Sequence, residues 1–170
     1  YDACRKVCIL ASLAFGKHVY PNQVETEGIT NITLEDVSYI ENAGGVIKLL
    51  GQIKYINDNE IAAFVSPAVV YNGSQLASVK DVFNAILVRG DAVGDVCFYG
   101  PGAGKLPTAS AVVADIIDCA KHSDRKKIFG WGAGNEDYVV DYKERIEMPF
   151  YVRAKATPAE INAKFSDVKF

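Results

Sequence analysis

Two charged side chains near the start of the chain, Asp2 and Lys6, have the types and spacing that proton-transfer chemistry requires. Residues four positions apart on a helix lie on the same face, one turn from each other. On a face that borders a cleft, such a lysine can pass a proton to or from a substrate oxygen, and the aspartate can orient it or bind a substrate ammonium. The spacing alone favours a simpler alternative, an exposed ion pair of small energetic value.

A second candidate is the glycine-rich turn Gly100–Gly104, which leads into an expected helix. Backbone amides at such a junction favour anions. The turn is not a Walker A loop, because Tyr99 stands where the first glycine belongs and Leu106 where Ser or Thr would coordinate magnesium. It is not the dinucleotide fingerprint either, since Lys105 replaces the third glycine. On spacing alone, a structural turn is favoured over a phosphate site.

The cysteines, histidines and other carboxylates give no further predicted site. Cys4 and Cys8 are one helical turn apart, but no histidine or additional cysteine lies nearby to complete a tetrahedral set, so no metal site is expected. We interpret the four cysteines as buried, reduced thiols of a cytoplasmic protein. A carboxylate cluster is the less favoured alternative to solvated loop charges. The residues interpreted as surface or loop positions are His18, His122, Glu25, Glu27 and Asp36.

The composition excludes several classes of protein. Of 170 residues, 49% are hydrophobic and 23% charged, which is enough for one compact domain with a sizeable core. The net charge is −3, so the chain lacks the basic excess that a nucleic-acid partner requires. No apolar run reaches the roughly 20 residues of a membrane helix. Because the chain begins at Tyr1 and its only methionine is Met148, we expect a piece of a longer protein.

The hydrophobic pattern predicts helices that cover a mixed, mainly antiparallel sheet, an α+β fold with a short C-terminal β-α segment. A first helix is expected from Asp2 to about Phe15, with Gly16 as its stop, and a second begins at Thr33, capped together with Asp36. A proline inside the second strand, Pro67, indicates an edge position or a bulge. The other expected elements are a loop at 17–32, strands at 46–56, 60–71, 85–89, 95–99 and 148–155, and helices at 107–121 and 158–165.

Taken together, these segments resemble the homoserine dehydrogenase family. The opening segment Tyr1–Gly16 resembles the family signature, in which a lysine follows an aspartate after three intervening residues. The most specific resemblance is Phe98–Asp115, which contains the glycine-rich turn and the helix after it. The segments Val24–Ile29, Gly45–Leu50 and Ala63–Pro67 continue the resemblance in the same order.

The resemblance implies an NAD(P)-dependent oxidoreductase that interconverts aspartate semialdehyde and homoserine. Lys6 matches the family's proton-transfer lysine, whose ammonium would protonate the alkoxide that forms when hydride reaches the aldehyde carbon. Asp2 matches the aspartate that helps to hold substrate and lysine, and Gly104 matches a glycine that approaches the nicotinamide nucleotide. The cofactor, NADP or NAD, would be bound mostly by a domain expected before Tyr1.

The same resemblance implies a homodimer, a cytoplasmic location and a monovalent cation site upstream of this chain. Two alternatives remain: a non-catalytic dimerisation module in which the charged pair is structural, and an anion- or nucleotide-binding module that uses Gly100–Gly104. Neither a nucleic-acid nor a membrane partner is expected. The predicted parts are a catalytic, substrate-binding and dimerisation domain at 1–122, a linker or surface loop at 123–147, and the truncated start of an ACT-like regulatory domain at 148–170.

Overall fold

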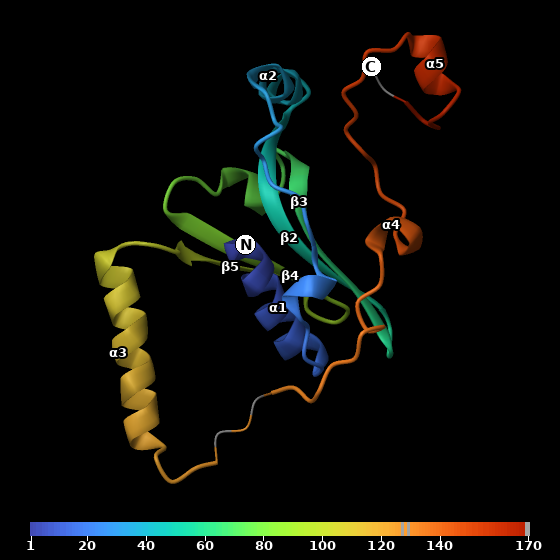
Figure 1. The fold of residues 1–170 in the computed structure, drawn as a ribbon. Helices are drawn as coiled ribbons and strands as arrows, with labels where there is room; N and C mark the ends of the chain where they lie inside the picture. The colour runs from blue at the N-terminus through green and yellow to red at the C-terminus, as the bar shows by residue number, and fades with distance from the viewer. Residues whose placement is uncertain (127, 129, 169–170) are drawn as a thin grey trace.

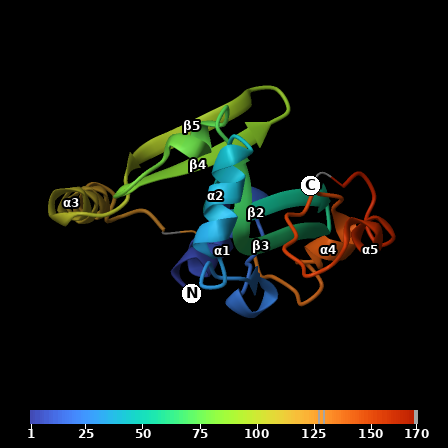
Figure 2. The same cartoon turned by 90° about the horizontal axis from the view of Figure 1, so that it is seen from above.

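The computed structural model describes residues 1–126, 128 and 130–168, and it shows two small sheets with helices packed on one of them and others standing away from it (Figure 1, Figure 2). The predicted α+β class is confirmed. The last two positions of the predicted C-terminal segment lie outside the described residues. The elements in chain order are α1 (Asp2–Phe15), η1 (Pro21–Gln23), β1 (Glu25–Thr26), α2 (Leu34–Asn42), β2 (Gly45–Asn57), β3 (Glu60–Tyr71), η2 (Gln75–Ser78), β4 (Phe83–Gly90), β5 (Gly94–Pro101), α3 (Lys105–Lys121), α4 (Tyr142–Arg145) and α5 (Pro158–Asn162).

The strands divide into two sheets instead of the single one expected from the sequence. The first is mixed, with the order β1-β3-β2, in which β3 is antiparallel to β2 and parallel to β1. The second is the antiparallel hairpin of β4 and β5. β1 lies in a region that was expected to be loop, because a strand of two residues leaves no periodic pattern to detect.

Pro67 lies in the central strand of the first sheet, and the β2–β3 register continues past it without a bulge. Within the described residues, β1 pairs only with Phe64 and Val65, so β3 has β2 alone as its neighbour at Pro67. The Val65 carbonyl accepts a hydrogen bond from Glu27 on the β1 side, and strand residues two apart direct their backbone groups to the same side. The proline nitrogen therefore faces away from β2, and the predicted edge position holds locally but not for the whole strand.

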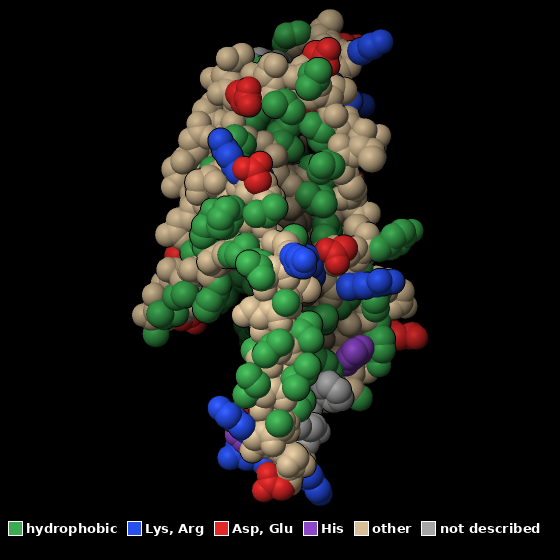
Figure 3. Space-filling view, turned by 90° about the vertical axis from the view of Figure 1, so that its left-hand side faces the viewer, with side chains coloured by type: hydrophobic (Ala, Val, Ile, Leu, Met, Phe, Trp, Pro, Cys, Tyr) green, Lys and Arg blue, Asp and Glu red, His purple; other side chains and the backbone are tan. Residues whose placement is uncertain are grey.

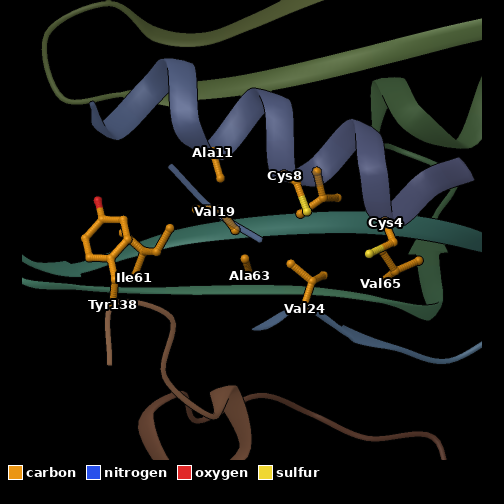
Figure 4. Close-up of a cluster of buried hydrophobic side chains, with 10 residues drawn as sticks. Cys4, Cys8, Ala11, Val19, Val24, Ile61, Ala63, Val65 and Tyr138 are labelled. Carbon is orange, nitrogen blue, oxygen red and sulfur yellow. The ribbon is translucent and has the colours of Figure 1, made fainter. Parts of the chain in front are cut away.

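The main core lies between α1 and one face of β3 (Figure 4). α1 contributes residues at helical spacing and β3 contributes alternate residues, as expected for two amphipathic elements packed together. Gly16 ends α1 in the left-handed conformation, with φ of 73°, as predicted. The labelled members of this cluster in Figure 4 are Cys4, Cys8, Ala11, Val19, Val24, Ile61, Ala63, Val65 and Tyr138.

The opposite face of β3 is covered by residues from much later in the chain. This later segment first pairs with the edge of β3: the backbone of Ile61 donates to the Tyr138 carbonyl and accepts from the Val140 amide, both at 2.9 Å. The Tyr142 ring then stacks on Phe64, with ring centroids 3.9 Å apart. Residues 138–142 belong to the segment predicted as a linker or surface loop, and they complete the burial of β3 on both faces.

The strand expected near 148–155 does not form, and that prediction was wrong. The described residues of this segment are irregular, because no sheet edge pairs with them there. Two of its side chains dock on α2 instead: Tyr151 donates to Asp36 at 2.8 Å, and Arg153 forms an ion pair with the same carboxylate. The predicted cap of α2 by Thr33 and Asp36 is confirmed, and a short helix, α5, forms within the predicted range at 158–165.

α3 is set apart from this core in both ribbon views (Figure 1, Figure 2). It buries none of its residues, so hydrophobic side chains gather along its outer surface (Figure 3). None of the helices in the described part of the chain combines the length and apolar character that crossing a bilayer requires. The large apolar residues that α3 exposes are Leu106, Val112, Val113, Ile116 and Ile117.

Candidate active site

α1 brings the predicted charged pair together. Lys6 Nζ lies 2.8 Å from a carboxylate oxygen of Asp2, and the two side chains are 60% and 83% exposed, respectively. The buried residues of α1 lie on the other side of the helix, against the sheet, so the pair faces away from the core. The structure therefore places both groups on an open surface at the N-terminal end of α1.

The electrostatics of the pair favour its charged form. The hydrogen bond from Lys6, together with its positive charge, lowers the pKa of the Asp2 carboxyl below its usual value. Asp2 also lies in the first helical turn, where a negative charge interacts favourably with the helix dipole. An ammonium group has three N–H donors. Asp2 occupies one of them and orients the group, which leaves donors that can reach the oxygen of a bound substrate.

Gly104, the predicted cofactor-contacting residue, lies at the junction between β5 and α3. It is the N-cap of α3, with φ of 124° and ψ of 153°, a conformation that residues with a side chain rarely adopt. The first amides of a helix have no acceptor within the helix, and they attract anions such as phosphate. Pro107 removes one of these donors, so the amides of Lys105 and Leu106 are the ones available at this end.

The two predicted sites lie on separate elements. α1 lies on the β1-β3-β2 sheet, whereas Gly104 follows the β4–β5 hairpin, and α3 lies away from α1 in both ribbon views (Figure 1, Figure 2). An open hollow of about 340 Å³ lies between β2, η2 and β4, and its lining contains neither Lys6 nor Gly104. Within the described residues, Lys6 and Gly104 therefore lie on separate elements, and neither lines this hollow.

Gly51 is a residue that the sequence analysis missed. It lies on β2 directly beneath α1, and a Cβ atom added to it would lie 2.4 Å from Cγ2 of Val7, the neighbour of Lys6 in sequence. The signal was present in the sequence, because an isolated glycine inside a strand pattern often marks close approach of another element. What the pattern does not reveal is which element approaches.

The remaining candidates have structural partners or lie apart. Glu25 forms an ion pair with Lys143 at 2.5 Å, and Asp36 forms one with Arg153, so these carboxylates do not form a cluster. Asp36 is 2% exposed, and its prediction as a solvated loop charge was wrong, because Tyr151 and Arg153 cover it. In the described ranges, no group of three or more His, Cys, Asp or Glu residues is placed to hold a metal ion.

The cysteines follow the prediction in part. Cys4 and Cys8 are buried on the inner face of α1, and burial raises the pKa of the Cys8 thiol to about 11. Cys97 is half-buried and Cys119 is exposed. The prediction of four buried thiols is therefore wrong for Cys119, because nothing in the described structure covers the α3 surface that carries it.

Known proteins share this sequence and fold. A model of the homoserine dehydrogenase family matches residues 1–117. Homoserine dehydrogenase of Pseudomonas aeruginosa is 38% identical over 91% of this chain and 37% of its own length, so that match extends past Ile117. Homoserine dehydrogenase of Bacillus subtilis is 41% identical over 71% of this chain and 28% of its own length.

Solved structures agree with the sequence matches. The Staphylococcus aureus homoserine dehydrogenase crystal structure at pH 7.5 has a TM-score of 0.66 and 43% identity, covering 74% of this chain and 31% of that one. The enzyme from Thiobacillus denitrificans has a TM-score of 0.68 and 39% identity, covering 82% of this chain and 33% of that one. The fold is thus an α+β domain similar to part of these enzymes. The chain belongs to the homoserine dehydrogenase family, and it spans about a third of the length of these relatives.

Proposed function

We propose that this chain is the substrate-binding and proton-transfer part of an enzyme that interconverts aspartate semialdehyde and homoserine. The observation that carries the proposal is the oriented Asp2–Lys6 pair, which lies within the segment matched by the family. An exposed pair is what a domain would present to substrate held against it by another part of the enzyme. Lys6 is the proton-transfer residue of this proposal, and Asp2 orients it and helps to hold the substrate.

The proton step follows from the geometry of the pair. A nicotinamide nucleotide supplies the hydride that reduces the aldehyde carbon, which leaves a negative charge on the substrate oxygen. The Lys6 ammonium donates a hydrogen bond to that oxygen, stabilises the developing charge and then transfers the proton, so the alkoxide becomes a hydroxyl. In the oxidative direction the neutral Lys6 amine takes the same proton back.

The proposal extends to the cofactor at one position. The positive φ of Gly104 and the free first amides of α3 fit a phosphate-bearing group such as NADP or NAD. Most of the binding surface for that group, and a monovalent cation site, belong in this proposal to a domain that precedes residue 1. The discrimination between NADPH and NADH belongs to the same domain.

The domain organisation and the partners are part of the same proposal. Residues 1–122 form the catalytic and dimerisation domain, and 148–170 begin an ACT-like regulatory domain. The segment 123–147 links them, with its residues 138–142 packed on β3. The proposal includes a cytoplasmic location and a homodimer. The homodimer is supported by the apolar residues that the hairpin exposes, which a second subunit would cover. These residues are Phe83, Ile86, Val88, Phe98 and Tyr99.

The experiment that tests the function is steady-state homoserine oxidation by the full parent enzyme with Lys6→Ala. We expect kcat to fall roughly 10²-fold or more at unchanged circular dichroism, because the proton acceptor is lost. Arg5→Ala is the matched control, since Arg5 is exposed on the same helical turn and should leave kcat within a few-fold. Equal activity of the Lys6→Ala and Arg5→Ala enzymes would show that Lys6 is a structural charge.

Equal activity of the Lys6→Ala and Arg5→Ala enzymes would favour the second candidate, a non-catalytic dimerisation module. The exposure of Lys6 on the outer face of α1 is compatible with both candidates. Membership of the homoserine dehydrogenase family favours the catalytic one.

A further inference from the structure

The contact between α1 and β2 has no room for a side chain at Gly51. A Cβ there would lie 2.4 Å from Val7 Cγ2, well below the distance of about 3.5 Å at which carbon atoms pack. Val7 is 4% exposed and belongs to the main core, so it does not sit loosely over the strand. Something must move if the glycine is replaced.

The residues of α1 and β2 that contact each other have matching spacing along the two elements. A single strand residue can therefore affect how the helix packs. Phe15 of α1 stacks against Tyr55 of β2 with ring centroids 6.2 Å apart, and Val7 lies over Gly51. The two helix positions are eight residues apart and span about 12 Å, and the two strand positions are four residues apart and span about 13 Å. Each two turns of the helix therefore rest on four residues of the strand, and at Gly51 the helix leaves no room for a Cβ atom.

Val7 cannot easily rotate away from an added methyl group. A β-branched side chain in a helix has one strongly preferred χ1 rotamer, and the core around Val7 is closely packed. An alanine at position 51 would therefore push this turn of α1 outward by about 1 Å to reach ordinary contact distance. Lys6 precedes Val7 in the same turn, and Asp2 lies one turn before Lys6, so the charged pair moves with it.

We propose that Gly51 is a positioning residue for proton transfer: its lack of a side chain sets the depth of α1 on the sheet and thereby the position of Lys6. This inference rests on the proposed function of Lys6. Gly51 touches no reacting atom and acts through Val7. A misplacement of about 1 Å at a reacting group can lower a rate by about 10²-fold, so a small helix shift has a large catalytic effect.

The test compares the full parent enzyme with Gly51→Ala, Val7→Ala and the double variant. We expect Gly51→Ala to lower kcat by about 10-fold to 10²-fold, with the KM for the nucleotide nearly unchanged. The double variant should recover kcat to within a few-fold of the wild type, because removing Cγ2 of Val7 frees the space that the new methyl group occupies. Gly73→Ala is the control, since a Cβ at Gly73 meets nothing within 4 Å.

A purely structural role predicts a different pattern. The double variant lacks buried methyl groups of Val7, so activity that merely followed stability would not recover. The proposal is overturned if Gly51→Ala keeps the wild-type kcat, or if a folded double variant shows no recovery of kcat. It is also overturned if neither Gly51→Ala nor the double variant folds. If only Gly51→Ala fails to fold, the activity of the double variant decides in the same way. If Gly51→Ala keeps the wild-type kcat while Lys6→Ala loses it, only this inference is overturned. If Lys6→Ala keeps the wild-type kcat, the proposed function itself is overturned.

Discussion

α1 and α3 are both helices rich in alanine and aliphatic residues, with 14 and 17 residues, respectively. α1 buries Cys4, Val7, Cys8, Ala11 and Ser12 against the sheet, and α3 buries none of its residues. The two helices therefore have similar amino-acid compositions, but in the described structure only α1 buries residues against a sheet. Because packing of an apolar face provides most of the stability of a helix in a protein, this difference should be large in any measurement of stability.

The exposed face of α3 also bears on the proposed function. A helix whose N-terminus carries the predicted nucleotide contact, and whose length displays Val112, Val113 and Ile116 to solvent, has the surface of an element that packs against another domain. α1 carries its charged pair outward and its apolar residues inward. α1 is thus stabilised by packing on the sheet, whereas α3 buries none of its residues and follows β5 at its N-terminal junction.

The largest expected effect comes from placing the same charge on both helices. Ala11 is 0% exposed, and Ala11→Asp would bury an unpaired carboxylate, which costs about 3–5 kcal/mol of unfolding free energy. Ala111→Asp, at an exposed position of α3, should cost about 0.7 kcal/mol or less, which is the difference in helix propensity. Urea unfolding of the 170-residue chain, followed by circular dichroism, measures both. Equal losses would mean that α3 is as well packed as α1.

α2 is an intermediate case, because its N-terminus is covered by the later segment that carries Tyr151 and Arg153. Hydrogen bonds from the Thr33 backbone and from Tyr151 lower the pKa of Asp36 from 3.8 to about 2. The stabilisation by this carboxylate is therefore complete above about pH 4 and is lost as the pH falls through about 2. We expect Asp36→Asn to lower the urea midpoint at neutral pH, and the difference from wild type to shrink between pH 4 and pH 2.

Asp91→Asn serves as the control for this pH series, because Asp91 is exposed in the turn between β4 and β5. A difference between wild type and Asp36→Asn that stays constant down to pH 2 would contradict the assigned ionisation.

The smallest expected effect on stability compares two exposed pairs with the same i,i+4 spacing. Asp2 pairs with Lys6 on α1, and Asp118 lies 2.9 Å from His122 on α3. Neither Asp2→Asn nor Asp118→Asn should move the urea midpoint measurably, because exposed pairs contribute little. In the full parent enzyme, Asp2→Asn should raise the KM for homoserine and lower kcat, while Asp118→Asn changes neither. If Asp2→Asn leaves the KM for homoserine and kcat unchanged, the Asp2–Lys6 pair has no catalytic role, like the Asp118–His122 pair on α3.

Local patterns were enough to predict much of this fold. The helix ending at Gly16 and the cap at Thr33 depend on neighbours in sequence, and both are confirmed. The pairing of Asp2 with Lys6 was predictable for the same reason, since four-residue spacing fixes the contact once the helix exists.

What could not be predicted depends on contacts between distant residues. Asp36 becomes buried because Tyr151 and Arg153, 115 and 117 residues later, reach it. The depth of α1 depends on Gly51, whose meaning is visible only once Val7 is known to lie above it. The strand expected at 148–155 did not form, because a local sequence pattern gives no information about whether a sheet edge is available.

Tyr138 belongs to a core whose other members lie much earlier in the chain, so this core can be completed only late in synthesis. Its ring closes one end of the core formed by α1 and β3, and its hydroxyl donates to the carbonyl of Phe15, 123 residues earlier. Contacts at such separation require closure of a long loop, and they form late in folding. On the ribosome, β3 therefore emerges with one face already able to meet α1 and the other still uncovered, and it must wait for the segment around Tyr142 before both faces are shielded. During that interval the nascent chain exposes Phe64 and Ala62 to other hydrophobic surfaces.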